Sequence, residues 1–362
     1  MIRNSPRKTG IFTYDFYPFI GGIGRYVYNI YLNKNEKRLV FFSNRRNSLV
    51  GHFYLKNPLF FLKNIGLSIV LNLTINHIIK AHQLNQINIH SGPGGILFIR
   101  KPKIPVVITS HHTYYQEIQK ASFNPLKKIY LFFEKLTYKN ATKIICTLPE
   151  NKLLLIKRYA ISGNKIDLVP CSIDPKQFYP MDIEKIPHSI LYIGRFDRRK
   201  GLEFLLEAFK LVVRKKPESR LYLGGKGKEL QRIKEIVRNY KIGSHVIFLG
   251  FVPEAQLNAW YNKAQIVILP SQFEGFGITL IEAMATGARV IGTNVDGIRS
   301  IIIDGKNGRL VDYGNVNHLS EIIHDLLEQN SRPMTNISNI IRKEYDSRQV
   351  SRNYIKLLES VK

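Results

Sequence analysis

Short apolar runs and amphipathic stretches alternate along the whole chain. Runs rich in β-branched and aromatic residues, which are typical of strands, occur at 10–14, 38–43, 87–90, 106–110, 143–147, 189–193, 220–224, 245–249, 265–269, 289–292 and 308–311. Helical spacing of apolar positions fills the intervals, for example at 24–31, 203–213, 228–240, 254–262 and 278–285. Strands that alternate with helices in this way predict an α/β fold with doubly wound parallel sheets covered on both faces.

Prolines interrupt this alternation near the middle of the chain. The stretch 169–187 contains four prolines and has no clear periodicity, and 362 residues suit two domains. We therefore predict an N-terminal Rossmann-like domain at 1–172, a linker at 173–187 and a C-terminal Rossmann-like domain at 188–346. The tail at 347–362 has a helical apolar stripe and should form a helix that docks on either domain, the N-terminal one being a candidate.

Charge and cysteine content narrow the classes of function. The chain has 54 Lys and Arg against 27 Asp and Glu, and residues 1–180 carry 26 of the basic but only seven of the acidic side chains. The N-terminal half should therefore face nucleic acid, an acidic substrate or an anionic bilayer. Helix-turn-helix, zinc-finger and RNP-type motifs are absent from the sequence, which disfavours nucleic acid. Cys146 and Cys171 are too few for a disulfide framework or a thiolate metal cluster and suggest reduced cytosolic thiols.

Two apolar stretches of the N-terminal half bear on membrane contact. The basic start of the chain lacks a following hydrophobic region, so we expect no signal peptide. Polar residues interrupt 53–79, so we expect no transmembrane span there. The stretch 59–73 and a helix at 125–139, whose apolar stripe is Leu126, Ile129, Tyr130, Phe133 and Leu136, each allow two interpretations: a packing helix with a solvated basic face, or a surface that binds an anionic membrane.

The segment 270–287 carries the most specific chemistry. A strand ends near Leu269, a loop carries Glu274-Gly275-Phe276-Gly277, and a helix begins near Ile278. Glycines let the backbone approach a ligand, and the N-terminus of the following helix favours phosphate. Glu282, one turn into that helix, can accept hydrogen bonds from a ribose diol, whereas Glu274 lies nearer the group beyond the far phosphate. The two carboxylates should therefore bracket a diphosphate.

Two other strand–loop–helix junctions agree with this interpretation. Arg195 and Lys200 follow the strand at 189–193 and can neutralise a diphosphate, while Arg198 and Arg199 are expected to be solvated. After the first strand, the glycines of the G-G-x-G string at 21–24 open a helix. That string alone is a weak signal, because a simple strand–helix turn has the same pattern.

Together these segments resemble the retaining glycosyltransferases of family GT4, which have the GT-B fold of two Rossmann-like domains facing across a cleft. The resemblance covers nearly the whole chain. It includes the glycine loop at 21–24, the strand-to-histidine segment 105–111, the hinge string 169–174, the loop 194–201, the string 250–253 and the E-x7-E signature from Glu274 to Glu282. In the hinge string, Cys171 and Ser172 replace an Asn-Gly pair often seen there, which weakens the register of the hinge.

The resemblance implies a role for each matching residue. Glu282 would bind the donor ribose, Arg195 and Lys200 the diphosphate, and the backbone near Phe276 the sugar together with Glu274. The remaining donor-binding positions would be Gly22, Gly250, Phe251, Val252, Gly275, Gly277 and Ile278. The acceptor side would contain Gly21, Gly24 and His111, with His112 as the alternative to His111, which the register favours. The groups that take part in the reaction would be Glu274, Lys200, Arg195 and His111.

The resemblance also implies the reaction. It would be a metal-independent, cofactor-free hexosyl transfer with retained anomeric configuration, from a UDP-sugar or GDP-sugar to a lipid-linked glycan, polysaccharide or phospholipid of the cell surface. No D-x-D metal motif is present in the sequence. With the basic N-terminal half, we expect a cytoplasmic enzyme bound peripherally to the inner face of the cytoplasmic membrane. The alternatives are a GT-B synthase acting on a soluble sugar and, more remotely, a nucleic-acid-binding protein; the sequence leaves the oligomeric state open.

Overall fold

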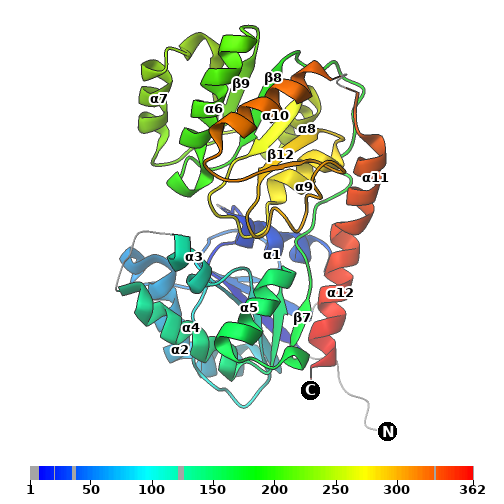
Figure 1. Ribbon diagram of the computed structural model, residues 1–362. Coiled ribbons are helices and arrows are strands. Elements are labelled where there is room, and N and C mark those ends of the chain that lie inside the picture. Colours follow the sequence, from blue (N-terminus) through cyan, green and yellow to red (C-terminus); the bar gives the residue numbers. More distant parts are fainter. Residues whose placement is uncertain (1–7, 20, 35–37, 121–125, 330–331, 362) are drawn as a thin grey trace. The chain divides into compact units, whose positions relative to one another are not determined.

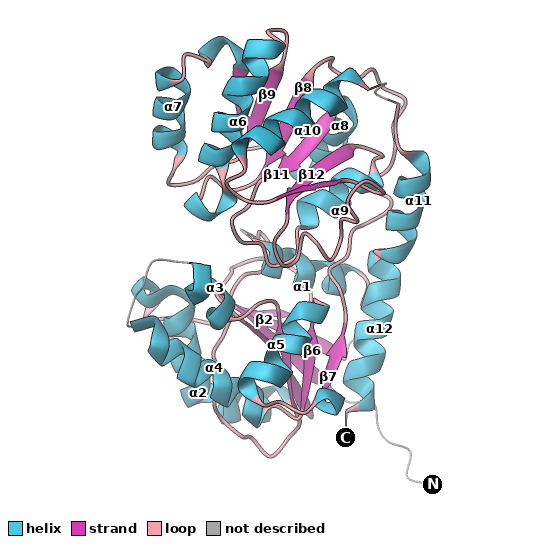
Figure 2. Cartoon of the chain, viewed as in Figure 1, coloured by secondary structure: helices cyan, strands magenta, loops and turns pink. Residues whose placement is uncertain are grey.

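Two parallel sheets, each flanked by helices, form the framework of the protein (Figures 1 and 2). The computed structural model describes residues 8–19, 21–34, 38–120, 126–329 and 332–361. The chain divides into two units: unit 1 contains residues 1–172 and 347–362, and unit 2 contains residues 173–346. The expectation of no signal peptide concerns the start of the chain, of which residues 1–7 lie outside the described residues. The α/β class expected from the sequence is confirmed in both units.

Unit 1 is built on a seven-stranded parallel sheet with the order β3-β2-β1-β4-β5-β6-β7. Its strands are β1 (Thr9–Thr13), β2 (Leu39–Ser43), β3 (His52–Tyr54), β4 (Gln86–Ser91), β5 (Val106–Ser110), β6 (Lys143–Cys146) and β7 (Ile166–Leu168). Its helices are α1 (Gly22–Leu32), α2 (Lys63–His82), α3 (Tyr114–Lys120), α4 (Leu126–Asn140), α5 (Pro149–Tyr159) and α12 (Ser347–Ser360). The sequence did not predict β3 and β7, because both are three-residue, partly exposed edge strands with little periodicity.

The C-terminal helix α12 packs on unit 1. The Tyr354 side chain is fully buried, and its hydroxyl donates to Asn88 Oδ1 at 2.6 Å on β4. The Gln86 side-chain amide donates to the Leu358 carbonyl at 3.1 Å, and the Ser351 hydroxyl donates to the Asn29 carbonyl at 3.3 Å. These bonds join residues more than 260 positions apart. They show that the helix docks on unit 1, a choice of domain that the amphipathic pattern left open.

Helix α4 is oriented differently from its predicted stripe. Ile129 and Phe132 are 52% and 61% exposed, whereas the inward face carries Glu134 and Tyr138, which are fully buried. Glu134 accepts hydrogen bonds from the Tyr114 amide at 2.9 Å and from the Tyr159 hydroxyl. These bonds compensate the burial of a carboxyl group. The inward face is therefore rotated from the expected stripe, of which Ile129 is exposed and Tyr130, Phe133 and Leu136 are half-buried. The side chains of Leu126 and Lys127 lie outside the described residues.

Helix α2 follows a short 3-10 turn, η1 (Phe60–Leu62), and carries large apolar residues on its exposed side as well as on its buried side. The span Phe60–His82 is long and apolar enough to cross a membrane, by length and composition only. In unit 1, however, Leu67, Leu71 and Ile75 belong to the core next to β1 and β4. The helix is therefore part of the folded unit, with one side in the core and the opposite side carrying exposed residues.

Unit 2 is built on a six-stranded parallel sheet with the order β10-β9-β8-β11-β12-β13. Its strands are β8 (Ser189–Ile193), β9 (Arg220–Gly224), β10 (Val246–Gly250), β11 (Ile266–Leu269), β12 (Arg289–Thr293) and β13 (Arg309–Val311). Its helices are α6 (Leu202–Lys215), α7 (Leu230–Asn239), α8 (Glu254–Lys263), α9 (Ile278–Ala285), α10 (Val316–Glu328) and α11 (Thr335–Glu344). The strand order reverses between β8 and β11, and such a reversal opens a crevice at the carboxyl ends of the strands.

The proline-rich segment 173–187 belongs to unit 2 rather than forming a separate linker. The backbone amides of Tyr179 and Met181 donate to the side chains of Asn258 and Asn262 on α8, at 3.1 and 2.8 Å. The Lys185 ammonium donates to the carbonyls of Asn262 and Ala264, both at 2.9 Å. Since side-chain amides satisfy this backbone, the segment is ordered without having any periodicity that the sequence could reveal.

Candidate active site

Two loops follow the adjacent strands β8 and β11 at the carboxyl edge of the second sheet. Residues 194–201 lead from β8 through the turn η3 (Arg198–Lys200) to α6, and residues 270–277 lead from β11 to α9. Both loops therefore begin at the point where the strand order reverses, between β8 and β11 (Figure 2). The position is the one where parallel α/β sheets hold their ligands.

Glycine and backbone hydrogen bonds hold these two loops against each other. Gly201 has a φ of +68°, and a Cβ atom there would lie 1.9 Å from the Pro270 carbonyl oxygen. The Gln272 amide donates to the Arg199 carbonyl at 2.8 Å, and the Arg199 guanidinium donates to the Phe273 carbonyl at 3.4 Å. A side chain at position 201 would force the loops apart, so glycine is required by the close approach.

An ion pair between Lys200 and Glu274 lies where the loops meet. The Lys200 ammonium donates to Glu274 Oε2, which also accepts from the Ser271 hydroxyl at 3.2 Å, and Glu274 Oε1 accepts from the Gly275 amide at 3.2 Å. Each of the two paired side chains is 12% exposed. From the sequence we expected the Lys200 ammonium to bind a diphosphate and the Glu274 carboxylate to bind a sugar. In the structure the two groups bind each other.

The charges around this pair fix its ionisation. Burial acts to raise the pKa of Glu274, but Lys200, Arg199 and the Gly275 amide outweigh it and hold that pKa at about 2. Burial lowers the pKa of Lys200, and the Glu274 carboxylate opposes that shift. Glu274 is therefore a carboxylate at neutral pH, an acceptor for hydroxyl groups rather than a proton donor.

The arginines of the first loop differ in their surroundings. Arg195 and Arg198 are exposed, whereas Arg199 is half-buried and contacts the Phe273 carbonyl. The expectation of a solvated Arg199 was therefore wrong, because the loop after β11, distant in sequence, folds over it. Arg195 follows the end of β8, where its backbone carbonyl accepts from the Tyr192 hydroxyl at 2.8 Å, and its exposed guanidinium is available to an anionic ligand.

A third glycine string, Gly224-Gly225-Lys226-Gly227, begins at the last residue of β9 and was not predicted as part of the site. Gly225 has a φ of +141°, and a Cβ there would lie 1.8 Å from the Gly194 carbonyl oxygen. The Gly225 amide donates to the Gly250 carbonyl at 2.6 Å, which ties the loop to the end of β10. A G-G-x-G string at the end of a predicted strand was the signal that could have revealed it.

The expected base-binding string follows β10 at the same edge of the sheet. Phe251 is 65% exposed, and the Lys226 ammonium lies 5.4 Å from the centroid of its ring, while Val252 is buried. Gly250 has a φ of +67° and open space around it. An exposed aromatic ring beside the glycine loops offers a flat apolar surface on which a planar base can stack.

Helix α9 begins directly after the second loop. Gly277 caps it with a φ of +96°, Ile278 is its first residue, and the Phe276 ring packs on Tyr345 with ring centroids 6.0 Å apart. Glu282 is 3% exposed and accepts a hydrogen bond from the Tyr261 hydroxyl at 2.9 Å. The E-x7-E spacing thus separates one partly accessible carboxylate, Glu274, from one that is almost fully buried.

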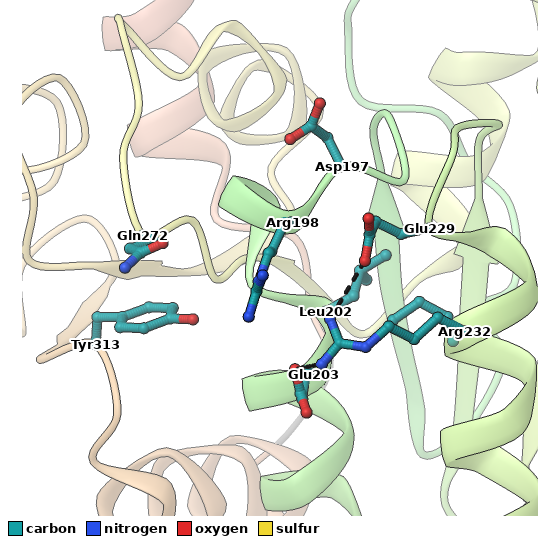
Figure 3. Close-up of a pocket in the computed structure, with 9 residues that line it drawn as sticks. Asp197, Arg198, Leu202, Glu203, Glu229, Arg232, Gln272 and Tyr313 are labelled. Atoms are coloured by element: carbon teal, nitrogen blue, oxygen red, sulfur yellow. Dashed lines mark hydrogen bonds and ion pairs between the residues drawn. The ribbon is translucent and has the colours of Figure 1, made fainter. Parts of the chain in front are cut away.

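A hollow of about 200 Å³ lies on another side of the first loop (Figure 3). Arg198 and Tyr313 point into it, and Arg232 pairs there with Glu203 at 2.5 Å and with Glu229 at 3.3 Å. The lining has three acidic side chains, Asp197, Glu203 and Glu229, against two arginines, and Arg232 is already bound by two of the carboxylates. The hollow is therefore a poor site for an anion. Among the described residues, no group of three or more His, Cys, Asp or Glu side chains is arranged to hold a metal ion.

In unit 1, the glycine loop after β1 is held by an aspartate that the sequence did not single out. Asp15 is 8% exposed, and its Oδ2 accepts from the Gly21 amide at 2.8 Å. Gly21 precedes α1 and Gly22 is its first residue. A Cβ at Gly24 would lie 2.6 Å from Asp15 Oδ2, so this glycine is needed for packing. Part of the G-G-x-G pattern is therefore explained by the turn itself.

The two histidines after β5 lie in different surroundings. His111 is buried, its Nε2 lies 2.9 Å from His90 Nδ1, and its ring meets Tyr26 edge-on with centroids 5.0 Å apart. His112 is half-buried. Burial lowers the pKa of His90 to about 3, and burial together with His90 and His112 lowers that of His111 well below its usual range. Both rings of the His90–His111 pair are therefore neutral at physiological pH.

Tyr354 of α12 completes this network. Its hydroxyl lies 3.2 Å from His90 Nε2 and donates to Asn88 Oδ1. His90 and Tyr354 are the residues behind His111 that sequence reasoning missed, because they come from β4 and from the end of the chain. The preference for His111 over His112 as the acceptor-side residue stays a prediction.

Two family models together match most of the chain. "Glycosyl transferases group 1" matches residues 176–344, and "Glycosyltransferase Family 4" matches residues 20–177. Among curated relatives, an uncharacterised glycosyltransferase of Methanocaldococcus jannaschii is 28% identical over 320 residues, which cover 86% of each chain.

Solved structures share the fold. The sucrose-phosphate synthase of Thermosynechococcus elongatus has a TM-score of 0.83 at 23% identity and covers 96% of this chain and 97% of its own. HepE of Anabaena, solved with UDP and glucose, has a TM-score of 0.78 at 16% identity and covers 98% and 100%. WaaG, described as a glycosyltransferase involved in lipopolysaccharide biosynthesis, has a TM-score of 0.78 at 18% identity and covers 98% and 99%.

Proposed function

This chain is a hexosyltransferase of glycosyltransferase family GT4 with the GT-B fold, and we propose that it transfers a sugar with retention from a nucleoside diphosphate donor to a cell-surface glycan or lipid-linked acceptor. The observation that carries this proposal is the Lys200–Glu274 pair at the junction of two glycine-bearing loops. It combines a cation for the diphosphate with a carboxylate for the sugar hydroxyls, next to the N-terminus of α9.

The leaving diphosphate is the group that the reaction has to stabilise. Negative charge develops on it as the bond to the sugar breaks, so groups aimed at it contribute more in the transition state than in the ground state. Lys200, the exposed Arg195 and the backbone near Gly277 are the groups of unit 2 that we assign to this role. Removing one such donor typically costs about 10²–10³ in kcat.

A retaining front-face course is the stereochemistry we propose. A double displacement uses two carboxylates about 5 Å apart, one as nucleophile and one as acid. In the E-x7-E pair, Glu282 is buried against Tyr261, and Glu274 is bound by Lys200, Ser271 and the Gly275 amide. Glu274 is thus suited to binding sugar hydroxyls, and the acceptor would attack from the side on which the diphosphate leaves.

Uridine diphosphate is the donor nucleotide we favour, with guanosine diphosphate as the alternative. Support comes from HepE of Anabaena, a structure of the same fold that contains UDP and glucose. Phe251, Val252 and Gly250 would hold the base, and Glu282 the ribose. We assign no metal or other cofactor to the reaction, because basic side chains and the α9 N-terminus can take the place of a cation at the diphosphate.

A polymeric or lipid-linked acceptor of the cell surface is the class we favour. The acidic substrates of such pathways suit unit 1, since residues 1–172 and 347–362 carry 29 basic against seven acidic side chains. WaaG, a structural neighbour, is described as acting in lipopolysaccharide biosynthesis. A soluble sugar phosphate is the alternative, supported by the similarity to a sucrose-phosphate synthase. The enzyme would work in the cytoplasm, at the inner face of the membrane.

The test begins with donor binding. UDP should raise Tm by an amount set by its affinity, and GDP should do so less. Transfer from UDP-hexoses is then followed by the anomeric proton signals of the product, with α-configured product expected from an α-configured donor. Glu282→Ala should chiefly raise the donor KM, while the exposed Glu321→Ala serves as its matched control. An inverted product, or no stabilisation by any nucleoside diphosphate, would contradict the proposal.

A further inference from the structure

Large apolar side chains are exposed along η1, α2 and α4 in unit 1. Phe60 and Phe61 in η1 are 73% and 67% exposed, Leu73 on α2 is 72% exposed, and Phe132 on α4 is 61% exposed. We call the aromatic–basic surface the set formed by these four residues with Leu62, Ile69, Ile129, Lys63, Lys80, Lys128, Lys135 and Lys139, all of which are exposed. Single exposed apolar residues are ordinary, but a cluster of this kind marks an interaction site.

Helices α2 and α4 are neighbours, so the residues of this surface come from adjoining elements of unit 1. Both helices bind the segment 95–99: Asn64 and Asn72 of α2 donate to the carbonyls of Gly95 and Leu97, at 2.8 and 2.9 Å. From α4, Thr137 accepts from the Phe98 amide at 3.0 Å, and Asn140 donates to the Ile99 carbonyl at 2.7 Å. Figure 1 shows the two helices next to each other on the same side of unit 1.

The charge of this region has one sign. Residues 56–139 contain eleven Lys or Arg and only two acidic residues, Glu117 and Glu134. Glu134 is fully buried, so it adds no negative charge to the surface. On α4 the exposed residues Lys128, Ile129, Phe132 and Lys135 are spaced so that they share one face of the helix. Lysine and apolar side chains therefore lie on the same face. The surface therefore complements a partner that has negative charges on its outside and an apolar layer directly beneath them.

We propose that the aromatic–basic surface docks the enzyme on the anionic lipid bilayer, with Phe60, Phe61 and Phe132 inserted among the headgroups and the lysines bound to phosphates. A bilayer fits both components, since interfacial binding combines apolar insertion with attraction to anionic lipids. A second copy of the chain would bring like charges together. Leu67, Leu71 and Ile75 hold α2 in the core, so the helix lies on the membrane while unit 1 stays folded. The inference deepens the proposed acceptor class, on which its biological meaning rests, by naming the surface that meets the lipid.

Vesicle binding by the full chain tests this inference without using transferase activity. Vesicles of phosphatidylcholine alone are compared with vesicles that also contain phosphatidylglycerol, over a series of salt concentrations. We expect binding to the anionic vesicles only, falling steeply with salt. Phe60→Ser with Phe61→Ser should weaken it by roughly tenfold or more, and Lys128→Gln with Lys135→Gln by about fivefold per lysine.

Matched variants in unit 2 serve as controls. Ile303→Ser with Ile340→Ser removes apolar residues of similar exposure, 58% and 57%, and Arg214→Gln with Lys215→Gln removes two exposed bases. Both controls should bind vesicles as the unsubstituted chain does, and the Tm increase with UDP should be the same in all variants. That increase separates a failure of docking from a failure of the proposed donor site.

Several outcomes would overturn the inference. Equal binding to both vesicle types, equal weakening by the unit 2 variants, or no vesicle binding at all would each do so. A stable dimer that dissociates when Phe60 and Phe61 are replaced would instead assign the surface to self-association. Retention of a duplex or single-stranded nucleic acid at physiological salt, lost in the Lys128 and Lys135 variant, would assign it to nucleic acid.

Discussion

Removing the ammonium of Lys200 should separate the two roles of the Lys200–Glu274 pair. Lys200→Met keeps a side chain of similar length in the 12% exposed position but deletes the charge. If Lys200 stabilises the leaving diphosphate, kcat should fall by about 10²–10³, with a smaller change in the donor KM. The measurement is steady-state transfer with saturating acceptor, and the Tm increase with UDP reports whether the donor still binds.

The same substitution leaves the Glu274 carboxylate without its cation. Lys200, Arg199 and the Gly275 amide together hold the pKa of Glu274 at about 2 against an ordinary value of 4.5. At roughly 1.4 kcal/mol per unit this corresponds to about 3 kcal/mol for all three groups, so it is an upper bound for Lys200. Because the folded pKa lies below the unfolded one, this stabilisation is present above pH 4.5 and is lost as the pH falls towards 2. In Lys200→Met the cation is missing while burial remains, so the free energy of unfolding at neutral pH should drop by up to about 3 kcal/mol.

A second substitution distinguishes the lost charge from a damaged fold. In Lys200→Met with Glu274→Gln, no uncompensated buried charge remains, so most of the stability should return while kcat stays low. Urea unfolding at pH 7 measures the first quantity and transfer kinetics the second. The reasoning fails if Lys200→Met retains wild-type kcat, or if the double variant is as unstable as the single one.

Two other consequences can be measured directly. Gly201→Ala places a Cβ 1.9 Å from the Pro270 carbonyl oxygen at a φ of +68°. It should therefore lower the free energy of unfolding by about 1–3 kcal/mol and raise the donor KM. The control Gly243→Ala, at a position with open space around it, should change neither quantity. Burial lowers the pKa of His90 to about 3, so the free energy of unfolding should fall by about 1.4 kcal/mol per pH unit as the pH drops from 6.5 towards 3. His90→Asn should remove this contribution from the pH dependence of stability, measured by urea unfolding at pH 7 and 5. An unchanged pH dependence would refute the buried network around His111.

Much of the second unit could be predicted from local sequence. The E-x7-E string lies between a buried strand and a helix, and the structure has β11 end at Leu269 and α9 begin at Ile278, as the pattern indicated. Strand β8 likewise ends at Ile193, just before Arg195 and Lys200. Local patterns succeed here because strand ends and glycine turns are set by residues adjacent in the chain.

Other features depend on contacts that no local pattern records. Arg199 looks like a solvated loop residue until Phe273, 74 positions later, accepts its hydrogen bond. The hydrophobic stripe of α4 misplaced its inward face, because three tyrosine groups from α3, α4 and α5 satisfy the buried Glu134. The segment 173–187 gave no signal of order, since its partners are side chains of α8.

The order of residues along the chain determined the alternation of strands and helices, the family and the loops that carry Arg195, Lys200, Glu274 and Glu282. Those properties depend on spacing, glycine and backbone geometry within a few residues. Tertiary structure alone decided that β8 lies beside β11, that Lys200 pairs with Glu274, and that Tyr354 reaches His90. Such pairings depend on the free energy of the whole packed unit, because segments distant in the sequence compete for the same partners. A local sequence pattern does not record that competition.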